Sequence, residues 1–188
     1  MKKMNLKEIL IPTIALLVIC LVATSLLAFT NSVTMEKIAL NAVETEKASR
    51  MLVLPEGKEY GEVTTLDSGI TYCIGTNEAG EDVGYVFTAG AKGYGGTVSV
   101  MVGIGKDGAI TGLEILSHAE TPGLGANAVK PDFKDRFLGK SGELTVDKNS
   151  NDGQNVQAIT AATITSKAVV SAVNEITAAY EEITGGAN

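Results

Sequence analysis

The sequence predicts an α+β protein in which a single N-terminal transmembrane helix is followed by one domain with a curved, largely antiparallel sheet and flanking helices. Three observations lead to this fold class. An apolar run covers residues 9–29, strand patterns of period two fill the middle of the chain, and an amphipathic pattern of helical period lies near the C-terminus. A chain of 188 residues has room for one domain and an anchor.

The apolar run from residue 9 to residue 29 is the predicted transmembrane helix. About 20 apolar residues in a helix cross the hydrocarbon core of a bilayer. Lys2, Lys3 and Lys7 precede the run, so the positive-inside rule places residues 1–8 in the cytoplasm and the domain outside. A cleaved signal peptide has a shorter apolar core, of about 7–15 residues. We therefore expect a retained, single-pass anchor in the cell membrane.

Residues 30–60 are predicted to form a connector helix and a linker, and the helix should end before Pro55. The domain then covers residues 61–188. Runs rich in Val, Ile, Tyr and Phe predict four strands, and a short helix or turn over residues 132–137 should carry Phe133 and Phe137 toward the core. Asp107-Gly108 provides the turn of the clearest hairpin. The predicted strands are 69–75, 84–89, 97–104 and 109–116.

The charge and cysteine content exclude several classes of function. The formal net charge is −7 and no basic stripe is present, so we expect no nucleic-acid partner. The two cysteines, Cys20 and Cys73, fall in the predicted span and in the domain, and no CxxC motif occurs. We therefore expect neither an iron–sulfur cluster nor a zinc site in this chain.

Hydroxyl residues lead into the C-terminal amphipathic helix. Its apolar face recurs at steps of four and three, and Thr160, Thr163, Thr165 and Ser166 come before it. The hydroxyls can cap this helix, or the helix start can bind a phosphate through its free backbone N–H groups. The pattern alone leaves both interpretations open. The apolar face consists of Val169, Val173, Ile176, Tyr180 and Ile183.

The segment 157–166 resembles the flavinylation motif Asp-x-x-Ser/Thr-Gly-Ala-Thr. This motif belongs to the FMN-binding domains of membrane-bound Rnf and Na+-translocating NADH:quinone reductase complexes. The resemblance implies that Thr163 carries FMN through a phosphoester, with Ala162 before it and Thr160 at the Ser/Thr position. Thr165 is the alternative attachment site.

Two residues depart from the family motif. Gln157 stands at the position of the Asp, and Ala161 stands at the position of the Gly. Ala161 would be strained if this position requires a positive φ. Both departures bear on whether the flavin is attached covalently.

A second segment, His118 to Gly125, resembles the Glu-Thr-Pro-Gly-Leu-Gly loop of the same domains, and Gly93 to Gly96 also resembles a family segment. Tyr94 is expected either near the flavin ring or in the core. His118 and Glu120 are expected to be either proton carriers or a solvated pair. The resemblance implies flavin contacts from Glu120, Thr121, Gly123, Leu124 and Gly125.

The family resemblance implies a membrane-anchored flavoprotein that relays electrons. The leading hypothesis is the G subunit of an Rnf complex, the ion-translocating ferredoxin:NAD+ oxidoreductase. Its partners would be the A, B, C, D and E subunits of that complex, and a flavin transferase during maturation. No nicotinamide fingerprint, P-loop or nucleophile triad occurs, so activity is expected only within the complex.

Three alternatives remain open from the sequence. They are the C subunit of the Na+-translocating NADH:quinone reductase, a cofactor-free structural or assembly subunit, and a stand-alone flavin reductase. The short connector favours the Rnf protein over the first alternative, and the absence of a second cofactor domain disfavours the last.

Overall fold

The computed structural model describes residues 6–185, so Lys2 and Lys3 of the predicted cytoplasmic segment lie outside the described residues. The chain divides into two compact units, which meet between Glu44 and Thr45. One helix, α1 (Leu6–Val53), contains both the predicted transmembrane helix and the predicted connector helix. Its segment Ile9–Met35 is long and apolar enough to cross a membrane.

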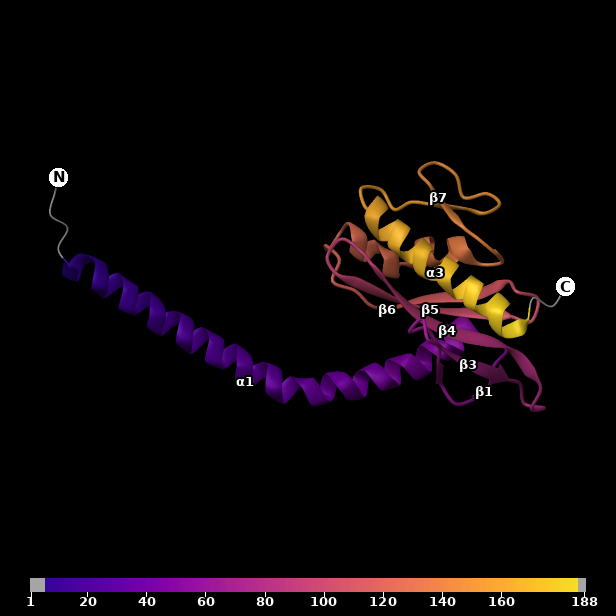
Figure 1. Cartoon of the computed structure of the whole chain (residues 1–188), viewed down its shortest axis with the longest axis horizontal. Helices are drawn as coiled ribbons and strands as arrows, with labels where there is room; N and C mark the ends of the chain where they lie inside the picture. The colour runs from indigo at the N-terminus through magenta and orange to yellow at the C-terminus, as the bar shows by residue number, and fades with distance from the viewer. Residues whose placement is uncertain (1–5, 186–188) are drawn as a thin grey trace. The chain divides into compact units, whose positions relative to one another are not determined.

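The second unit is built on an antiparallel sheet with the strand order β1-β3-β4-β5-β6, in which β2 also pairs with β3 (Figure 1). The four longer strands match the four that the sequence predicts. The two short strands, β1 and β2, were not predicted, because two residues carry no periodic pattern. The bounds are β1 (Glu59–Tyr60), β2 (Thr64–Thr65), β3 (Thr71–Thr76), β4 (Asp82–Lys92), β5 (Thr97–Gly105) and β6 (Ile110–Ser117).

Helix α3 (Thr163–Thr184) covers one face of the sheet and lies across β4 and β5 (Figure 1). Val169, Val173 and Ile176 are fully buried and belong to one apolar cluster with Phe87. These helix positions lie on the apolar face that the sequence pattern predicts, and burying each such side chain stabilises the fold by about 1.5–3 kcal/mol.

The opposite face of the sheet receives the end of α1. Val53 belongs to a smaller apolar cluster on this face, and its carbonyl oxygen accepts a hydrogen bond of 2.5 Å from Thr111 Oγ1. Gly103 and Gly112 pair across β5 and β6, and a Cβ at either position would overlap the backbone of Val53. The close approach of the two backbones therefore requires glycine at both positions.

After β6 the chain returns to α3 through short elements. These are η1 (Gly125–Val129), α2 (Pro131–Lys134) and η2 (Asp135–Phe137), followed by the parallel pair of β7 (Thr145–Asp147) and β8 (Asn155–Gln157). Phe133 and Phe137 are buried, as predicted, with their ring centroids 5.4 Å apart. The parallel pair was not predicted. The α+β fold class is confirmed. Strand β8 runs into residues 157–166, which we call the threonine segment.

Candidate functional site

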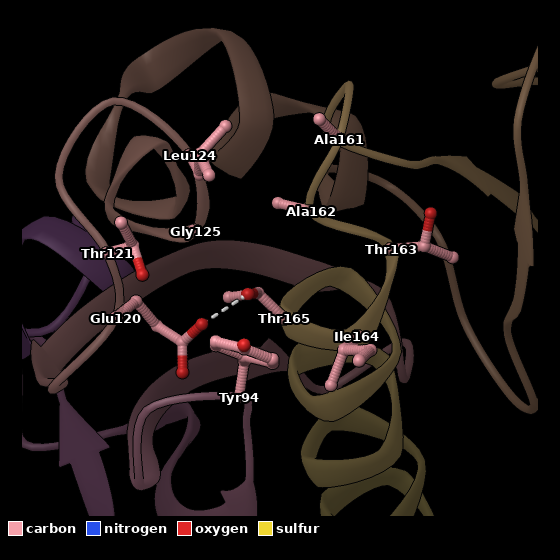
Figure 2. A pocket seen from close by; sticks show the side chains of 10 residues that line it. All are labelled: Tyr94, Glu120, Thr121, Leu124, Gly125, Ala161, Ala162, Thr163, Ile164 and Thr165. Carbon is pink, nitrogen blue, oxygen red and sulfur yellow. Dashed lines mark hydrogen bonds between the residues drawn. The ribbon is translucent and has the colours of Figure 1, made fainter.

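A pocket of about 530 Å³ lies at the N-terminal end of α3 (Figure 2). We call it the Glu120 pocket. Three segments far apart in sequence form it, namely the turn between β4 and β5, the loop after β6, and the first turn of α3. Eight of the ten site residues that the sequence predicts lie around it. Its lining is Tyr94, Glu120, Thr121, Leu124, Gly125, Ala161, Ala162, Thr163, Ile164 and Thr165.

Of the two interpretations that the sequence leaves open for these hydroxyls, capping of the helix is wrong. Helix α3 begins at Thr163 itself, its N-cap residue is Ala162, and no described side chain makes a capping hydrogen bond. The threonines therefore lie within the first turn or before the N-cap, and the first backbone N–H groups of the helix stay without an intrahelical partner. In Figure 2 the Thr163 side chain points away from Glu120 and Thr165.

Thr165 is buried and makes a different contact, because its hydroxyl donates a hydrogen bond to Glu120 Oε2. Ser166 is also buried. Its Oγ accepts a hydrogen bond of 2.9 Å from Ile159 N and donates one of 3.0 Å to Ala162 O. The Thr165 hydroxyl thus joins the first turn of the helix to the loop after β6, and the Ser166 hydroxyl joins it to the segment that precedes the helix.

Glu120 is a buried carboxylate, only 6% exposed, so the expectation of a solvated pair with His118 is wrong. Its Oε1 accepts a hydrogen bond of 2.9 Å from the backbone N–H of Gly95, and Oε2 accepts the bond from Thr165. Burial opposes ionisation, but these hydrogen bonds, together with the backbone of Tyr94 and the nearby His118, lower the pKa of Glu120 below its ordinary value. The carboxylate therefore stays ionised at neutral pH.

Glycine at two positions makes room for the Glu120 carboxylate. A Cβ at Gly93 would overlap Glu120 Oε1, and a Cβ at Gly125 would lie 2.5 Å from Thr165 Oγ1 and would also overlap Glu120 Oε2. The glycines of both family-like segments thus enclose the side chain of Glu120. The sequence contained the signal, since Gly93 and Gly125 lie in the segments that resemble the family.

Apolar side chains form the exposed part of the lining. Tyr94 is 73% exposed, Ile164 is 54% exposed and Leu124 is 43% exposed. The alternative that Tyr94 is a core aromatic is therefore wrong. Ile164 was not predicted as a site residue. The signal in the sequence is that this isoleucine, directly after Thr163, falls on the polar side of the helix pattern. Exposed apolar side chains that gather around one pocket are a feature of ligand-binding grooves.

A second pocket, of about 480 Å³, lies on the other side of the 157–161 segment. We call it the Arg136 pocket. Two predicted site residues, Thr160 and Gly123, line this pocket and not the Glu120 pocket. The whole lining is Gly123, Leu124, Asn127, Lys130, Asp132, Phe133, Arg136, Gln157, Ala158, Ile159, Thr160 and Ala161.

Arg136 fixes the first residue of the threonine segment. Its Nη1 donates a hydrogen bond to the carbonyl oxygen of Gln157, and its Nε donates one of 2.9 Å to Asp132 O. The guanidinium carbon lies 5.6 Å from the ring centroid of Phe133, which is a cation–π distance.

Ala161 lines both pockets and has a φ of 61°, a left-handed conformation that it shares with no other described residue except glycines. This conformation costs an alanine roughly 1–2 kcal/mol relative to the ordinary helical region. The expectation of strain at the family glycine position is confirmed.

The fold and the pocket define a class of protein. Residues 93–178 match the model of the FMN-binding domain family, and this stretch contains every residue of the Glu120 pocket. The fold of NqrC from Shewanella oneidensis is similar, with a TM-score of 0.50 over 63% of this chain and 64% of that chain, at 19% identity. The chain thus contains a domain of the FMN-binding family and, within residues 6–185, one apolar helix long enough to span a membrane.

Comparison with relatives identifies the family. The chain is 41% identical over 186 residues to the G subunit of the Na+-translocating ferredoxin:NAD+ oxidoreductase complex of Acetobacterium woodii, with 89% of each chain covered. It is 33% identical over 172 residues to the G subunit of the proton-translocating ferredoxin:NAD+ oxidoreductase complex of Clostridium ljungdahlii, with 91% of each covered. The chain belongs to the family of Rnf complex G subunits, and the predicted family is confirmed.

Proposed function

We propose that this chain relays electrons as the membrane-anchored G subunit of an ion-translocating ferredoxin:NAD+ oxidoreductase, and that it carries FMN as a phosphoester on Thr163. The observation that carries the proposal is the Glu120 pocket. It adjoins Thr163 and is built from the segments that resemble the family motifs. The relatives named as subunits of such complexes support the assignment to a complex.

The residues of the Glu120 pocket fit a flavin. Its volume of about 530 Å³ lies in the range of small-molecule sites. Tyr94, Leu124 and Ile164 offer apolar surface to a planar ring, and Thr121 offers polar groups to the edge of the ring. FMN, when bound, supplies electron-transfer chemistry that no amino-acid side chain provides.

The start of α3 suits the phosphate. The free N–H groups of the first turn and the positive end of the helix dipole attract an anion. No lysine or arginine is among the described residues that line this pocket, so the helix itself has to offset the charge of the phosphate. This arrangement supports a phosphoester at the first residue of α3.

The hydroxyls differ in their availability. Thr165 is buried and bonded to Glu120, whereas the Thr163 hydroxyl makes no hydrogen bond with any described residue. Thr163 is also only partly buried, which leaves it accessible to a flavin transferase. These contacts favour Thr163 over Thr165 as the attachment site.

The electron donors and acceptors of the flavin would be redox centres of the other Rnf proteins, the A, B, C, D and E subunits. The N-terminus would be cytoplasmic, because Lys2, Lys3 and Lys7 precede the apolar segment, and the domain would be extracytoplasmic. A covalent bond would then retain the flavin in a compartment without free FMN.

One alternative has a specific observation in its favour. Gln157 replaces the Asp of the family motif, and Ala161 adopts a conformation that suits glycine. If these departures prevent attachment, the chain is a structural subunit or binds FMN without a covalent bond.

The deciding experiment is denaturing electrophoresis of the protein from its native membrane under ultraviolet light, with the intact mass of the same band. A fluorescent band heavier by FMN less one water is expected. Thr163→Ala should remove both signals, and Thr65→Ala, at an exposed position of β2 outside the Glu120 pocket and the flavinylation motif, should keep both. A dark wild-type band would favour the alternative, and a fluorescent Thr163→Ala band would move the attachment to another residue.

Protease treatment of intact cells tests the orientation. The proposed topology predicts digestion of the domain without lysis. Digestion only after lysis would place the domain in the cytoplasm.

A further inference from the structure

We infer that the buried carboxylate of Glu120 lowers the reduction potential of the flavin in the Glu120 pocket. The inference rests on the proposed function and extends it, because it assigns a task to a charged residue that neither holds the phosphate nor attaches the cofactor.

Among the described residues no lysine or arginine forms an ion pair with Glu120, and His118 lies nearby without forming one. The ion pairs of the described residues are Arg50–Glu46 and Lys134–Glu114, and neither involves Glu120. Acidic residues are seldom this deeply buried unless a cation pairs with them, since desolvation of the charge is costly. A buried, unpaired carboxylate in a cofactor pocket therefore calls for a functional explanation.

Hydrogen bonds keep this charge in place and do not remove it. The backbone N–H of Gly95 and the hydroxyl of Thr165 both donate to the carboxylate, which favours the ionised form. Gly93 and Gly125 leave the space for its two oxygens. The fold thus holds a negative charge at a fixed position in the wall of the pocket.

A purely structural task would not need this charge. Glu120 joins the β4–β5 turn to the first turn of α3, and partly buried polar contacts elsewhere in this domain join segments without a charge. The neutral side chain of Asn174, for example, bonds both the N–H and the carbonyl oxygen of Leu144, at 2.8 and 2.9 Å.

The electrostatic consequence follows from the position of the charge. Every electron that enters the ring without a proton adds a negative charge beside an existing one, and the repulsion is strong where water is excluded. Glu120 is the one charged side chain among the described residues that line the pocket. Charges close to a flavin ring tune its potential, so a fixed carboxylate should make the reduced flavin a stronger electron donor.

The test is a spectroelectrochemical titration of the flavin-loaded, full-length protein at pH 7. Glu120→Gln should raise the midpoint potential, with at least a tenfold higher ratio of reduced to oxidised flavin at a fixed potential. For a two-electron couple this ratio corresponds to about 30 mV. The matched control is Glu175→Gln, an equal change of charge at an exposed position of α3, which should leave the potential unchanged.

Thr165→Val separates charge from geometry, and it also serves if Glu120→Gln does not fold. This variant keeps the carboxylate but removes the hydroxyl that partly neutralises it, so the potential should fall. An unchanged potential in Glu120→Gln, or a rise in Thr165→Val, would overturn the inference while leaving the flavin content and the proposed function intact. Wild-type protein without flavin would overturn both.

Discussion

The two pockets on either side of Ala161 differ in the sign and burial of their charges. The Glu120 pocket contains one buried carboxylate, and the Arg136 pocket contains the partly buried Arg136 and the exposed Lys130 beside Asp132. Glu120 connects two distant segments, whereas Arg136 fixes the backbone of the threonine segment. The threonine segment is therefore held from both sides, by a buried anion at its helical end and by a cation at its strand end.

Filling the space around the Glu120 carboxylate should change the free energy of unfolding more than any other substitution considered below. Gly125→Ala places a methyl group against Glu120 and Thr165, so it should destabilise the domain by about 1–3 kcal/mol, as overpacking does. Urea unfolding of the full chain measures this change. The matched control is Gly61→Ala, where the nearest atom to the new Cβ would be Ile74 O at 3.7 Å. Equal stability of the two variants would contradict the tight enclosure of Glu120.

Replacing the guanidinium of Arg136 should lower the free energy of unfolding by a smaller amount. Arg136→Lys keeps the charge but loses the bonds to Asp132 O and Gln157 O, so it should cost about 1–2 kcal/mol. Lys130→Gln, at an exposed position of the same pocket, should change the free energy of unfolding by less than about 0.5 kcal/mol. A loss in Lys130→Gln as large as that in Arg136→Lys would mean that charge, and not bonding, matters here.

Lowering the pH should remove the contribution of the Glu120 carboxylate to the stability of the domain. Because folding lowers the pKa of Glu120, the ionised carboxylate stabilises the fold above the ordinary glutamate pKa. This contribution is lost as the pH falls through the lowered pKa of the folded state. Thermal unfolding between about pH 6 and about pH 3 should therefore show a shallower loss of Tm in Glu120→Gln than in the wild type. Parallel curves would show that the pKa of Glu120 is not lowered by folding.

A substitution at Ala161, which lines both pockets, should change the free energy of unfolding least. Ala161→Gly removes the cost of a left-handed alanine but gives the unfolded chain more freedom, so it should stabilise the domain by at most about 1 kcal/mol. Ala178→Gly, at an exposed position inside α3, should destabilise it by about 1 kcal/mol. Thermal melting of both variants gives the comparison, and a destabilised Ala161→Gly would contradict the strain at this position.

The sequence predicts what depends on periodicity or on a family motif. The buried face of α3 follows from the spacing of Val169, Val173 and Ile176, and the β5–β6 hairpin follows from alternation and from the turn at Asp107-Gly108. Contacts between distant segments carry no such signal. The bond between Thr165 and Glu120 joins residues 45 positions apart. No threonine caps α3 because the helix begins at Thr163, so the N-cap position falls on Ala162, which has no hydroxyl.

The glycines around Glu120 also bear on which sequence changes are accessible to this family. A change of Gly93 or Gly125 to a larger residue is unfavourable as long as a glutamate fills the space, and a shorter residue at position 120 leaves that space empty. Each single step is therefore penalised, while a combined change can restore the packing. We expect strong epistasis among these three positions, so homologues should keep all three together or change them together.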